Sequence, residues 1–389
     1  MSKPDRKLLK LQADLAGKYG EEAAMFVSDM PKGEYVTTGS LSLDFALGTG
    51  GFPTNRALEI AGGEGTGKTT IGLLAMAQFL DAFPEKGALI LDLEHKLSEE
   101  WVKMLIGEER AKRVILLWPD TIEEATDMYT HSCATGLVSY VLLDSIGGAP
   151  SQRVFNKSAE IGNMGGNAIG VTRFAQFASV YSSKYSVCTV GVNQSRDDMT
   201  GYNRHVTPGG RAWKHACVAR IQLKQGKAKY FAKIDGEDLQ VGYAVVAKIV
   251  KNQMAAPYRV AWWPFYNIET EQYGFGIDRL SEISRLSLSV GVVDQRGAWY
   301  YHPELPGGKI RSQASLLDFM RDNEGFRELL AKQTIEAVSE RGLSAVAPSG
   351  AQGDLTDNDT ANSPLADIML DEDFGDSGEE NQDPEGDRK

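Results

Sequence analysis

The sequence is poor in the residues that build disulfides and transition-metal sites. It has 3 cysteines and 5 histidines among 389 residues. Cys133, Cys188 and Cys217 form no Cys-x-x-Cys pair, which argues against a disulfide scaffold or a cysteine zinc site and indicates a reducing compartment. The histidines are scattered and lack the close spacing of a metal-binding pair, which argues against a histidine metal cage.

Long apolar runs are also lacking. No stretch approaches the roughly 18 to 20 apolar residues of a transmembrane helix, and the first residues, MSKPDRKLLK, contain no apolar signal-peptide core. We therefore expect a cytoplasmic protein with no membrane partner. With 42% hydrophobic and 24% charged residues, the chain can bury a core, and its length suits one large α/β domain with small appendages.

The negative charge is concentrated at one end. The net charge is −12, and residues 344–389 hold 13 acidic and 2 basic residues, which leaves residues 1–343 near −1. A nearly neutral body with an acidic tail remains compatible with nucleic-acid binding. The tail is rich in Ser, Gly, Asp, Asn and Pro, a composition that predicts disorder. Within it, LADIMLDEDF (365–374) is either solvated chain or a docking motif.

Short apolar runs alternate with helical stretches between about residues 35 and 277. Strands are expected at 57–61, 88–93, 114–117, 140–143 and 187–192, and helices at 68–80, 122–133 and 172–184. This order predicts a mostly parallel central sheet flanked by helices. The more regular alternation over 241–250 predicts antiparallel strands that complete the sheet.

Both ends of this region carry smaller elements. Residues 4–19 place four leucines among Lys and Asp and predict a short amphipathic helix, whose apolar stripe should dock on its own core or on a neighbouring subunit. A small α/β unit is expected from about 278 to 340, with a strand at Trp299 to Tyr301. The predicted domain plan is an N-terminal helix and linker at 1–34, a core at 35–277, a small C-terminal domain at 278–343 and an acidic tail at 344–389.

A phosphate-binding loop is the first functional signal. The segment GGEGTGKTT matches G-x-x-x-x-G-K-T after an expected strand and before an expected helix. Such a loop turns backbone N–H groups toward phosphate oxygens, and the helix N-terminus adds its positive end. Lys68 should reach the β- and γ-phosphates, and the Thr69 hydroxyl should bind Mg²⁺. The expected nucleotide contacts are Gly62, Gly63, Glu64, Gly65, Thr66, Gly67, Lys68, Thr69 and Thr70.

Two carboxylates follow the ends of other expected strands. Asp144 ends YVLLD, where a second group directed at Mg²⁺ belongs, here through a water. Glu94 lies just beyond the strand in ALILDLEH, where it is either an ordinary surface residue or the general base that activates the attacking water.

Further segments resemble the bacterial RecA recombinases from about residue 5 to about residue 335. The segment TTGSLSLDFALGTGGFPTNRALEIAGGEGTGKTT leads into and includes the phosphate loop. It is followed, in the family's order, by DLEH, WPDTIEEA, LLDS, VNQSR, PGGRAWKHACVARIQL, IVKNQMAAP and RGAWYYH. The resemblance implies a RecA-like P-loop ATPase core with an N-terminal helix and a small C-terminal α/β domain. It also implies ATP and Mg²⁺ as cofactors and Glu94 as the catalytic carboxylate.

The resemblance implies four roles outside the phosphate loop. Trp101 stands where the family stacks an aromatic ring on adenine, with a core tryptophan as the alternative. Gln194 resembles the glutamine that senses the γ-phosphate and informs the DNA-binding loop after it; an amide can both donate and accept hydrogen bonds. Tyr273 resembles an aromatic that covers the nucleotide of the adjacent subunit. Lys251 is the candidate that reaches the neighbour's γ-phosphate.

Two loops, about 149–166 and 195–210, would line the DNA channel. Their Gly, Asn and small residues are typical of mobile segments that order on a ligand, although ordinary surface loops share this composition. Basic side chains there would meet phosphates, and Met164 and Tyr202 would wedge between bases or stack on them. The expected DNA contacts are Arg153, Met164, Gly165, Arg196, Tyr202, Arg204, Gly209, Gly210 and Arg211.

The sequence departs from the family pattern at several positions. The family's Lys-Asn-Lys reads Lys251-Asn252-Gln253 here, and an amide cannot neutralise developing charge. Both DNA loops are about two residues short, and Ile169 stands where an arginine is expected. We therefore transfer neither the detailed DNA contacts nor the co-protease role toward repressors, and this drift points to a phage-encoded member.

Together these features predict an ATP-dependent recombinase that forms a helical filament on single-stranded DNA and pairs it with homologous duplex. Single-strand-binding and loader proteins are further expected partners. One alternative is a hexameric DNA helicase on the same core, which would close a ring where the recombinase forms an open filament. The other is a non-catalytic, ATP-loaded coat or mediator, whose ATPase would not respond to DNA.

Overall fold

The structure is a computed structural model that describes residues 6–20, 24–29, 33–148, 150, 166–197, 205–206, 210–257, 259–271 and 273–344. The chain divides into two compact units, residues 1–34 and 35–389. The first unit holds α1 (Arg6–Tyr19) and the 3-10 turn η2 (Val27–Asp29). The Gln12 Nε2 amide donates a hydrogen bond of 2.7 Å to the Ala24 carbonyl, which ties α1 to the segment before η2. The predicted N-terminal helix is confirmed from Arg6 onward.

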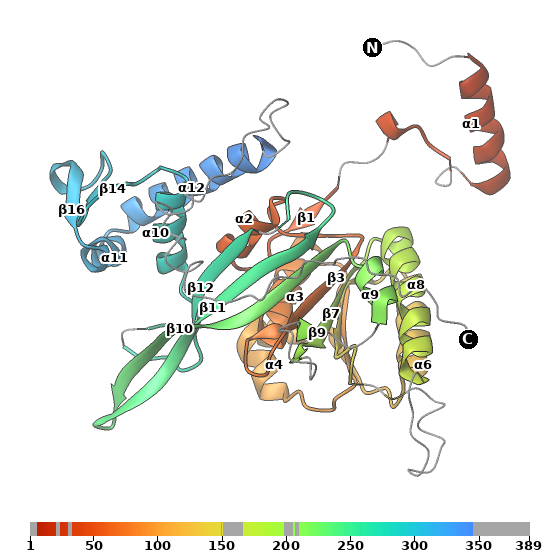
Figure 1. Ribbon diagram of the computed structural model, residues 1–389, viewed down its shortest axis with the longest axis horizontal. Coiled ribbons are helices and arrows are strands. Elements are labelled where there is room, and N and C mark those ends of the chain that lie inside the picture. Colours follow the sequence, from red (N-terminus) through yellow and green to blue (C-terminus); the bar gives the residue numbers. More distant parts are fainter. Residues whose placement is uncertain are drawn as a thin grey trace, which may run out of the picture. The chain divides into compact units, whose positions relative to one another are not determined.

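A nine-stranded sheet forms the centre of the second unit (Figure 1), with the order β13-β12-β11-β10-β3-β7-β6-β4-β5. Its strands are β3 (Ala57–Gly62), β4 (Gly87–Asp92), β5 (Val114–Leu117), β6 (Val138–Asp144), β7 (Cys188–Gln194), β10 (Ala219–Ile234), β11 (Glu237–Asn252), β12 (Val260–Tyr266) and β13 (Gly276–Ile277). From β10 to β5 neighbouring strands are parallel, whereas β11, β12 and β13 add antiparallel strands at one side. Both the mostly parallel sheet and its antiparallel completion are confirmed.

Helices cover both faces of the parallel strands (Figure 1). The helices before the C-terminal region are α2 (Leu41–Leu47), α3 (Lys68–Ala82), α4 (Glu99–Ile106), α5 (Glu108–Ala111), α6 (Ile122–Ala134), α8 (Gly166–Tyr185) and α9 (Gly210–Ala216). Successive strand residues point to opposite faces, so Ile90 and Leu142 pack with α3 and α4, while Leu89 and Leu143 pack with α6, α8 and α9. Two apolar cores therefore hold the sheet from both sides.

The carboxyl ends of the parallel strands meet along one edge of the sheet. Asp92 is in register with Asp144, and Gly62 is in register with Gln194. Ligands of open α/β sheets bind at this edge, where the loops after the strands converge. The fold thus gathers four segments that lie far apart in the sequence.

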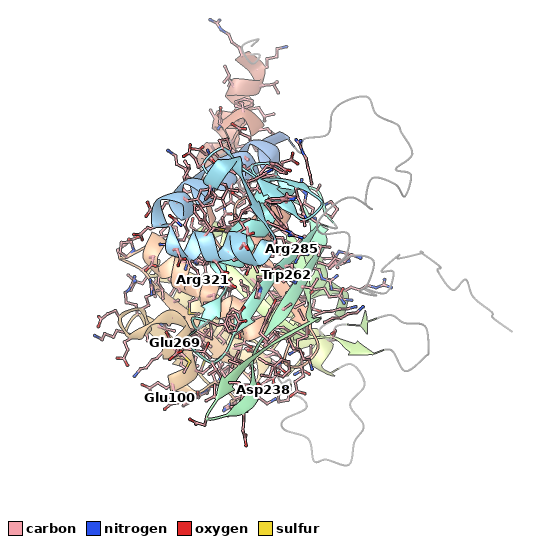
Figure 2. The ribbon with its side chains drawn as sticks, turned by 90° about the vertical axis from the view of Figure 1, so that its left-hand side faces the viewer. Glu100, Asp238, Trp262, Glu269, Arg285 and Arg321 are labelled. Carbon is pink, nitrogen blue, oxygen red and sulfur yellow. The ribbon has the colours of Figure 1, made fainter. Side chains whose placement is uncertain are left out.

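Two short ribbons and one long one complete the core. The pair β1 (Tyr35–Val36) and β2 (Phe52–Pro53) lies before the phosphate loop, and β8 (Arg196–Asp197) pairs with β9 (His205–Val206) within the predicted second DNA loop. The long strands β10 and β11 continue together beyond the sheet (Figure 1), with Asp238 labelled near their turn (Figure 2).

The C-terminal region has a core of its own, which includes Ile283, Tyr300 and Leu316. Its elements are α10 (Arg279–Ser289), β14 (Asp294–Arg296), β15 (Trp299–Tyr301), η3 (Pro306–Gly308), β16 (Lys309–Arg311), α11 (Gln313–Asp322) and α12 (Glu324–Ser344). The Arg285 guanidinium lies 4.3 Å from the centre of the Trp262 ring, which joins α10 to β12 (Figure 2). The predicted strand at Trp299 to Tyr301 is confirmed. The domain boundaries stay a prediction, and the predicted disorder of the tail lies outside the described residues.

The three cysteines are buried and unpaired. Burial raises the pKa of the Cys133 thiol to about 12, which keeps it protonated and unreactive. In the part of the chain that the structure describes, no helix is long and apolar enough to cross a membrane.

Gly191 provides a test of the packing beneath α9. A Cβ at Gly191 would lie 2.4 Å from Cζ2 of the fully buried Trp213 and 3.0 Å from Cγ1 of Ile146. Because neither neighbour can move freely, Gly191→Ala should lower the free energy of unfolding by about 1–3 kcal/mol, as overpacking typically does. Urea denaturation measures this. Gly325→Ala is the matched control, because apart from its chain neighbours and the backbone of its own helix no atom lies within 4 Å of a new Cβ there. Equal losses for both variants would contradict the packing argument.

Candidate active site

The phosphate loop runs from β3 into α3, and two of its glycines have left-handed conformations. Gly65 has φ +69° and Gly67, the residue that caps α3, has φ +86°, values that favour glycine. The Thr66 hydroxyl and the Lys68 ammonium both donate to the Gly63 carbonyl, at 2.9 and 2.5 Å. The loop therefore curls around the start of a 15-residue helix, whose free N–H groups favour anions.

Lys68 is half-buried among carboxylates. Burial lowers the pKa of its ammonium, and the charges of Asp144, Glu94 and Glu64 oppose that shift. Its present hydrogen bond to a backbone carbonyl can be exchanged for one to a phosphate oxygen.

Thr69 and Asp144 face each other across the loop. The Thr69 hydroxyl donates a hydrogen bond of 2.5 Å to Asp144 Oδ2. Burial raises the pKa of Asp144 to about 6, and the nearby Glu94 and Asp92 charges act in the same direction. The Thr69 hydroxyl and the Asp144 carboxylate are hard oxygen ligands, and a nearby cation would stabilise the ionised form of Asp144. This set fits a Mg²⁺ ion that keeps most of its waters.

Glu94 is held by donors on both carboxylate oxygens. Oε1 accepts from the Ser145 hydroxyl at 2.5 Å and from Gln194 Nε2 at 3.2 Å, and Oε2 accepts from Lys96 Nζ at 2.8 Å. Burial alone would raise the pKa of Glu94, but the hydrogen bonds from Lys96 and Ser145 bring it below its usual value. Its side chain is only 13% exposed, which sets it apart from an ordinary surface glutamate.

Gln194 connects this carboxylate to the predicted second DNA loop. It is the last residue of β7, and the next residue, Ser195, donates its N–H to the Gly62 carbonyl at 3.1 Å. The start of the loop is thus hydrogen-bonded to the phosphate loop at one point and to Glu94 at another.

The two aromatic candidates, Trp101 and Tyr273, contact different rings. Trp101, on α4, is half-buried and meets Phe275 edge-on, with ring centres 6.0 Å apart. Tyr273 stacks on Tyr266, with ring centres 4.3 Å apart. Phe275, which the sequence did not single out, rather than Tyr273, is therefore the residue that contacts Trp101 within one chain.

Lys251 does not meet the phosphate loop of its own chain. Its ammonium donates to the carbonyls of Lys214 and His215 at 2.9 and 3.2 Å, at the C-terminal end of α9. Burial lowers its pKa. Its predicted contact with a neighbour's γ-phosphate would require a second subunit and stays a prediction.

The predicted DNA contacts are described only in part. Gly210 and the exposed Arg211 begin α9, Arg196 belongs to β8, and the exposed Ile169 lies on α8. Within the predicted second DNA loop, Arg196–Asp197 pairs with His205–Val206 as the ribbon of β8 and β9. The contacts that lie outside the described residues are Arg153, Met164, Gly165, Tyr202, Arg204 and Gly209.

Sequence reasoning missed three side chains at the site. Ser145 and Lys96 hold the Glu94 carboxylate, and Asp92 accepts from the Glu94 and Leu97 N–H groups at 3.2 and 3.1 Å. All three lie within two residues of a predicted site residue, and this closeness in the sequence is the feature that could have identified them.

Comparison with known proteins gives one consistent family. The RecA N-terminal domain family matches residues 7–269. Protein RecA of a Thermus thermophilus strain is 30% identical over 339 residues, which cover 84% of this chain and 93% of that protein. Protein RecA of Bacillus thuringiensis (strain Al Hakam) is 31% identical over 324 residues, which cover 81% and 85%. With its parallel sheet, phosphate loop and matched length, the chain belongs to the RecA family.

Proposed function

We propose that this RecA-family chain is an ATP-dependent recombinase that forms a filament on single-stranded DNA and exchanges strands with homologous duplex. It is a P-loop ATPase that responds to DNA and acts in recombination and repair. One observation carries the mechanism: Gln194, from which the second DNA loop starts, donates a hydrogen bond to the Glu94 carboxylate. A change in that loop therefore has a direct route to the group that would activate water.

In this proposal the phosphate loop binds ATP. Lys68 leaves the Gly63 carbonyl for the β- and γ-phosphate oxygens, and the loop N–H groups hold the remaining oxygens. Thr69 would bind Mg²⁺ directly and Asp144 through a water. When bound, Mg²⁺ would neutralise negative charge on the phosphates.

Glu94 would act as the general base and Gln194 as the sensor. The water gives a proton to the Glu94 carboxylate as its oxygen attacks the γ-phosphorus. A bound γ-phosphate offers Gln194 a new acceptor, which would draw the end of β7 and the loop after it into a DNA-binding arrangement. Hydrolysis removes this acceptor, so ATP favours the DNA-bound state and its loss releases DNA.

Filament formation would complete the site between subunits. A head-to-tail contact that does not close produces an open helix. There Lys251 would reach the neighbour's γ-phosphate, Tyr273 would cover its nucleotide, and Trp101 would stack on adenine. The two DNA loops would grip backbone and base faces, so base pairing would supply the specificity for homologous duplex. Single-strand-binding and loader proteins would assist in the cytoplasm of a bacterium, or of a host cell if the protein is phage-encoded.

Strand exchange and electron microscopy test this function. We expect open filaments on single-stranded DNA with ATP, and exchange of a labelled strand with homologous but not heterologous duplex. Closed rings would favour the helicase alternative, and filaments whose ATPase ignores DNA would favour the coat alternative.

The acidic tail should weaken duplex binding by competing with DNA for basic groups of the body. Deleting residues 344–389 removes a net charge of −11 and should tighten duplex binding, most strongly at low salt because screening is weakest there. Fluorescence anisotropy across a salt series measures this. A full-length variant whose tail Asp and Glu are changed to Asn and Gln should behave like the deletion. Unchanged affinity for duplex DNA in both variants would contradict the prediction.

A further inference from the structure

Lys96 folds back onto Glu94 from two residues away. Its ammonium lies 2.8 Å from Glu94 Oε2 and its side chain is 73% exposed, whereas that of Glu94 is 13% exposed. The intervening His95 has φ +54°, a left-handed conformation that is uncommon for a residue other than glycine, and it lies between the two residues that form this ion pair. The exposed Lys96 side chain thus pairs with the outer oxygen of Glu94, whose other oxygen accepts hydrogen bonds from Ser145 and Gln194.

This contact restrains Glu94 as a base. Ser145 and Gln194 occupy Oε1, so Oε2 is the oxygen toward which a water proton would move, and Lys96 occupies it. An oxygen paired with an ammonium accepts a proton poorly, because the positive charge favours the ionised carboxylate. In this arrangement Glu94 is ionised, but Lys96 prevents its Oε2 from accepting a proton from water.

The surroundings allow Lys96 to leave. Besides Glu94, the charges of Glu64 and Asp144 act on Lys96, so its ammonium already lies within the field of the phosphate site. Exposed ion pairs are weak and easily exchanged. The γ-phosphate of ATP carries more negative charge than one carboxylate and offers a competing partner.

We propose that Lys96 is a positioning residue that keeps Glu94 inactive until ATP and DNA are both in place. The inference rests on the general-base role of Glu94 proposed above. When ATP is bound and the loop after Gln194 engages DNA, Lys96 transfers to the γ-phosphate and Oε2 opens to the water. The water proton then passes to Oε2, the water oxygen bonds to the γ-phosphorus, and the bond to the bridging oxygen breaks to give ADP and phosphate. Because Gln194 holds the other oxygen, DNA and Lys96 act on the same carboxylate.

The test compares Lys96→Met with Lys112→Met. Lys112 is also exposed and lies 2.7 Å from a glutamate, Glu109, on a surface helix. We expect Lys96→Met to raise the DNA-free kcat for ATP about two- to fivefold, the scale of an exposed ion pair. Because a charge contact made by an exposed lysine is weak, KM for ATP and the DNA-stimulated kcat should stay within about twofold of wild type, so the stimulation by DNA falls. Lys96→Arg should restore the low DNA-free rate, and Lys112→Met should match wild type.

Two results would overturn the proposal. One is an unchanged DNA-free kcat in Lys96→Met, and the other is a lowered DNA-stimulated kcat with no rise of the DNA-free rate, which would place Lys96 in transition-state stabilisation. Equal melting temperatures of the variants exclude a folding effect. A wild-type ATPase that ignores DNA would instead count against the recombinase function, while the DNA-free rates would still decide the role of Lys96.

Discussion

Replacing Lys68 by alanine is expected to lower kcat/KM for ATP by about 10²–10³-fold, the scale seen when one preorganised charge-stabilising donor is removed. Lys68 is half-buried at the start of α3, beside the carbonyl that it would leave for phosphate. Alanine removes the charged donor that the phosphate loop itself offers to the β- and γ-phosphates. The measurement is steady-state ATP hydrolysis with and without single-stranded DNA.

Controls separate this effect from loss of the fold. Lys103→Ala removes an exposed lysine paired with Glu99 at 2.7 Å, away from the phosphate loop, and should keep wild-type rates. Strong DNA stimulation in wild type that disappears in Lys68→Ala would support an ATPase completed on the DNA filament. Equal wild-type rates with and without DNA would mean that the second DNA loop is not coupled to the ATPase site. That result would favour the coat or mediator alternative.

Glu94→Gln should lower kcat by about 10²–10⁴-fold, the usual contribution of a general base, while leaving ATP binding and filament formation in place. Glutamine has the same shape and retains an oxygen that can accept from Ser145 and Gln194. It cannot take up the proton of the attacking water. Turnover is measured by phosphate release, and filaments are observed by electron microscopy with ATP.

Glu99→Gln is the matched control for this variant. Glu99 is an exposed carboxylate that also pairs with a lysine, Lys103, but lies on α4 outside the site. It should hydrolyse ATP at the wild-type rate. Full turnover in Glu94→Gln would remove Glu94 from the mechanism, and loss of filaments would show that the carboxylate also has a structural role.

The order of strands and helices could be predicted because it depends on local patterns. The apolar runs at β3, β4, β6 and β7 match buried parallel strands within one or two residues at each end. The phosphate loop could be identified for the same reason, since glycines, Lys68 and Thr69 are contiguous. That Asp144 ends β6 and Gln194 ends β7 followed from the lengths of those runs.

The state of Glu94 could not be predicted, because it depends on contacts between distant segments. Ser145 and Gln194 are 51 and 100 residues away in sequence, and they meet Glu94 only because β4, β6 and β7 lie in one parallel sheet. Lys96 is near in sequence, but its direction depends on the left-handed backbone conformation of His95. Likewise the ribbon of β8 and β9 has two residues a side, too few to show a period.

Two buried polar contacts away from the site were likewise not predictable from the sequence. Glu282 on α10 accepts from the Ser40 hydroxyl at 2.5 Å, and burial raises its pKa to about 8. Lys251 on β11 caps α9. Nothing in the sequence around either residue indicates these partners.

The sequence by itself determined the family, the sheet, the phosphate loop and the carboxylates at the strand ends, because periodicity and contiguous motifs are local properties of a chain. Only the tertiary structure decided which donors occupy the oxygens of Glu94 and where Lys251 rests. These contacts join strands and turns far apart in sequence, and their geometry follows from the strand order of the sheet and from the packing of helices on its two faces.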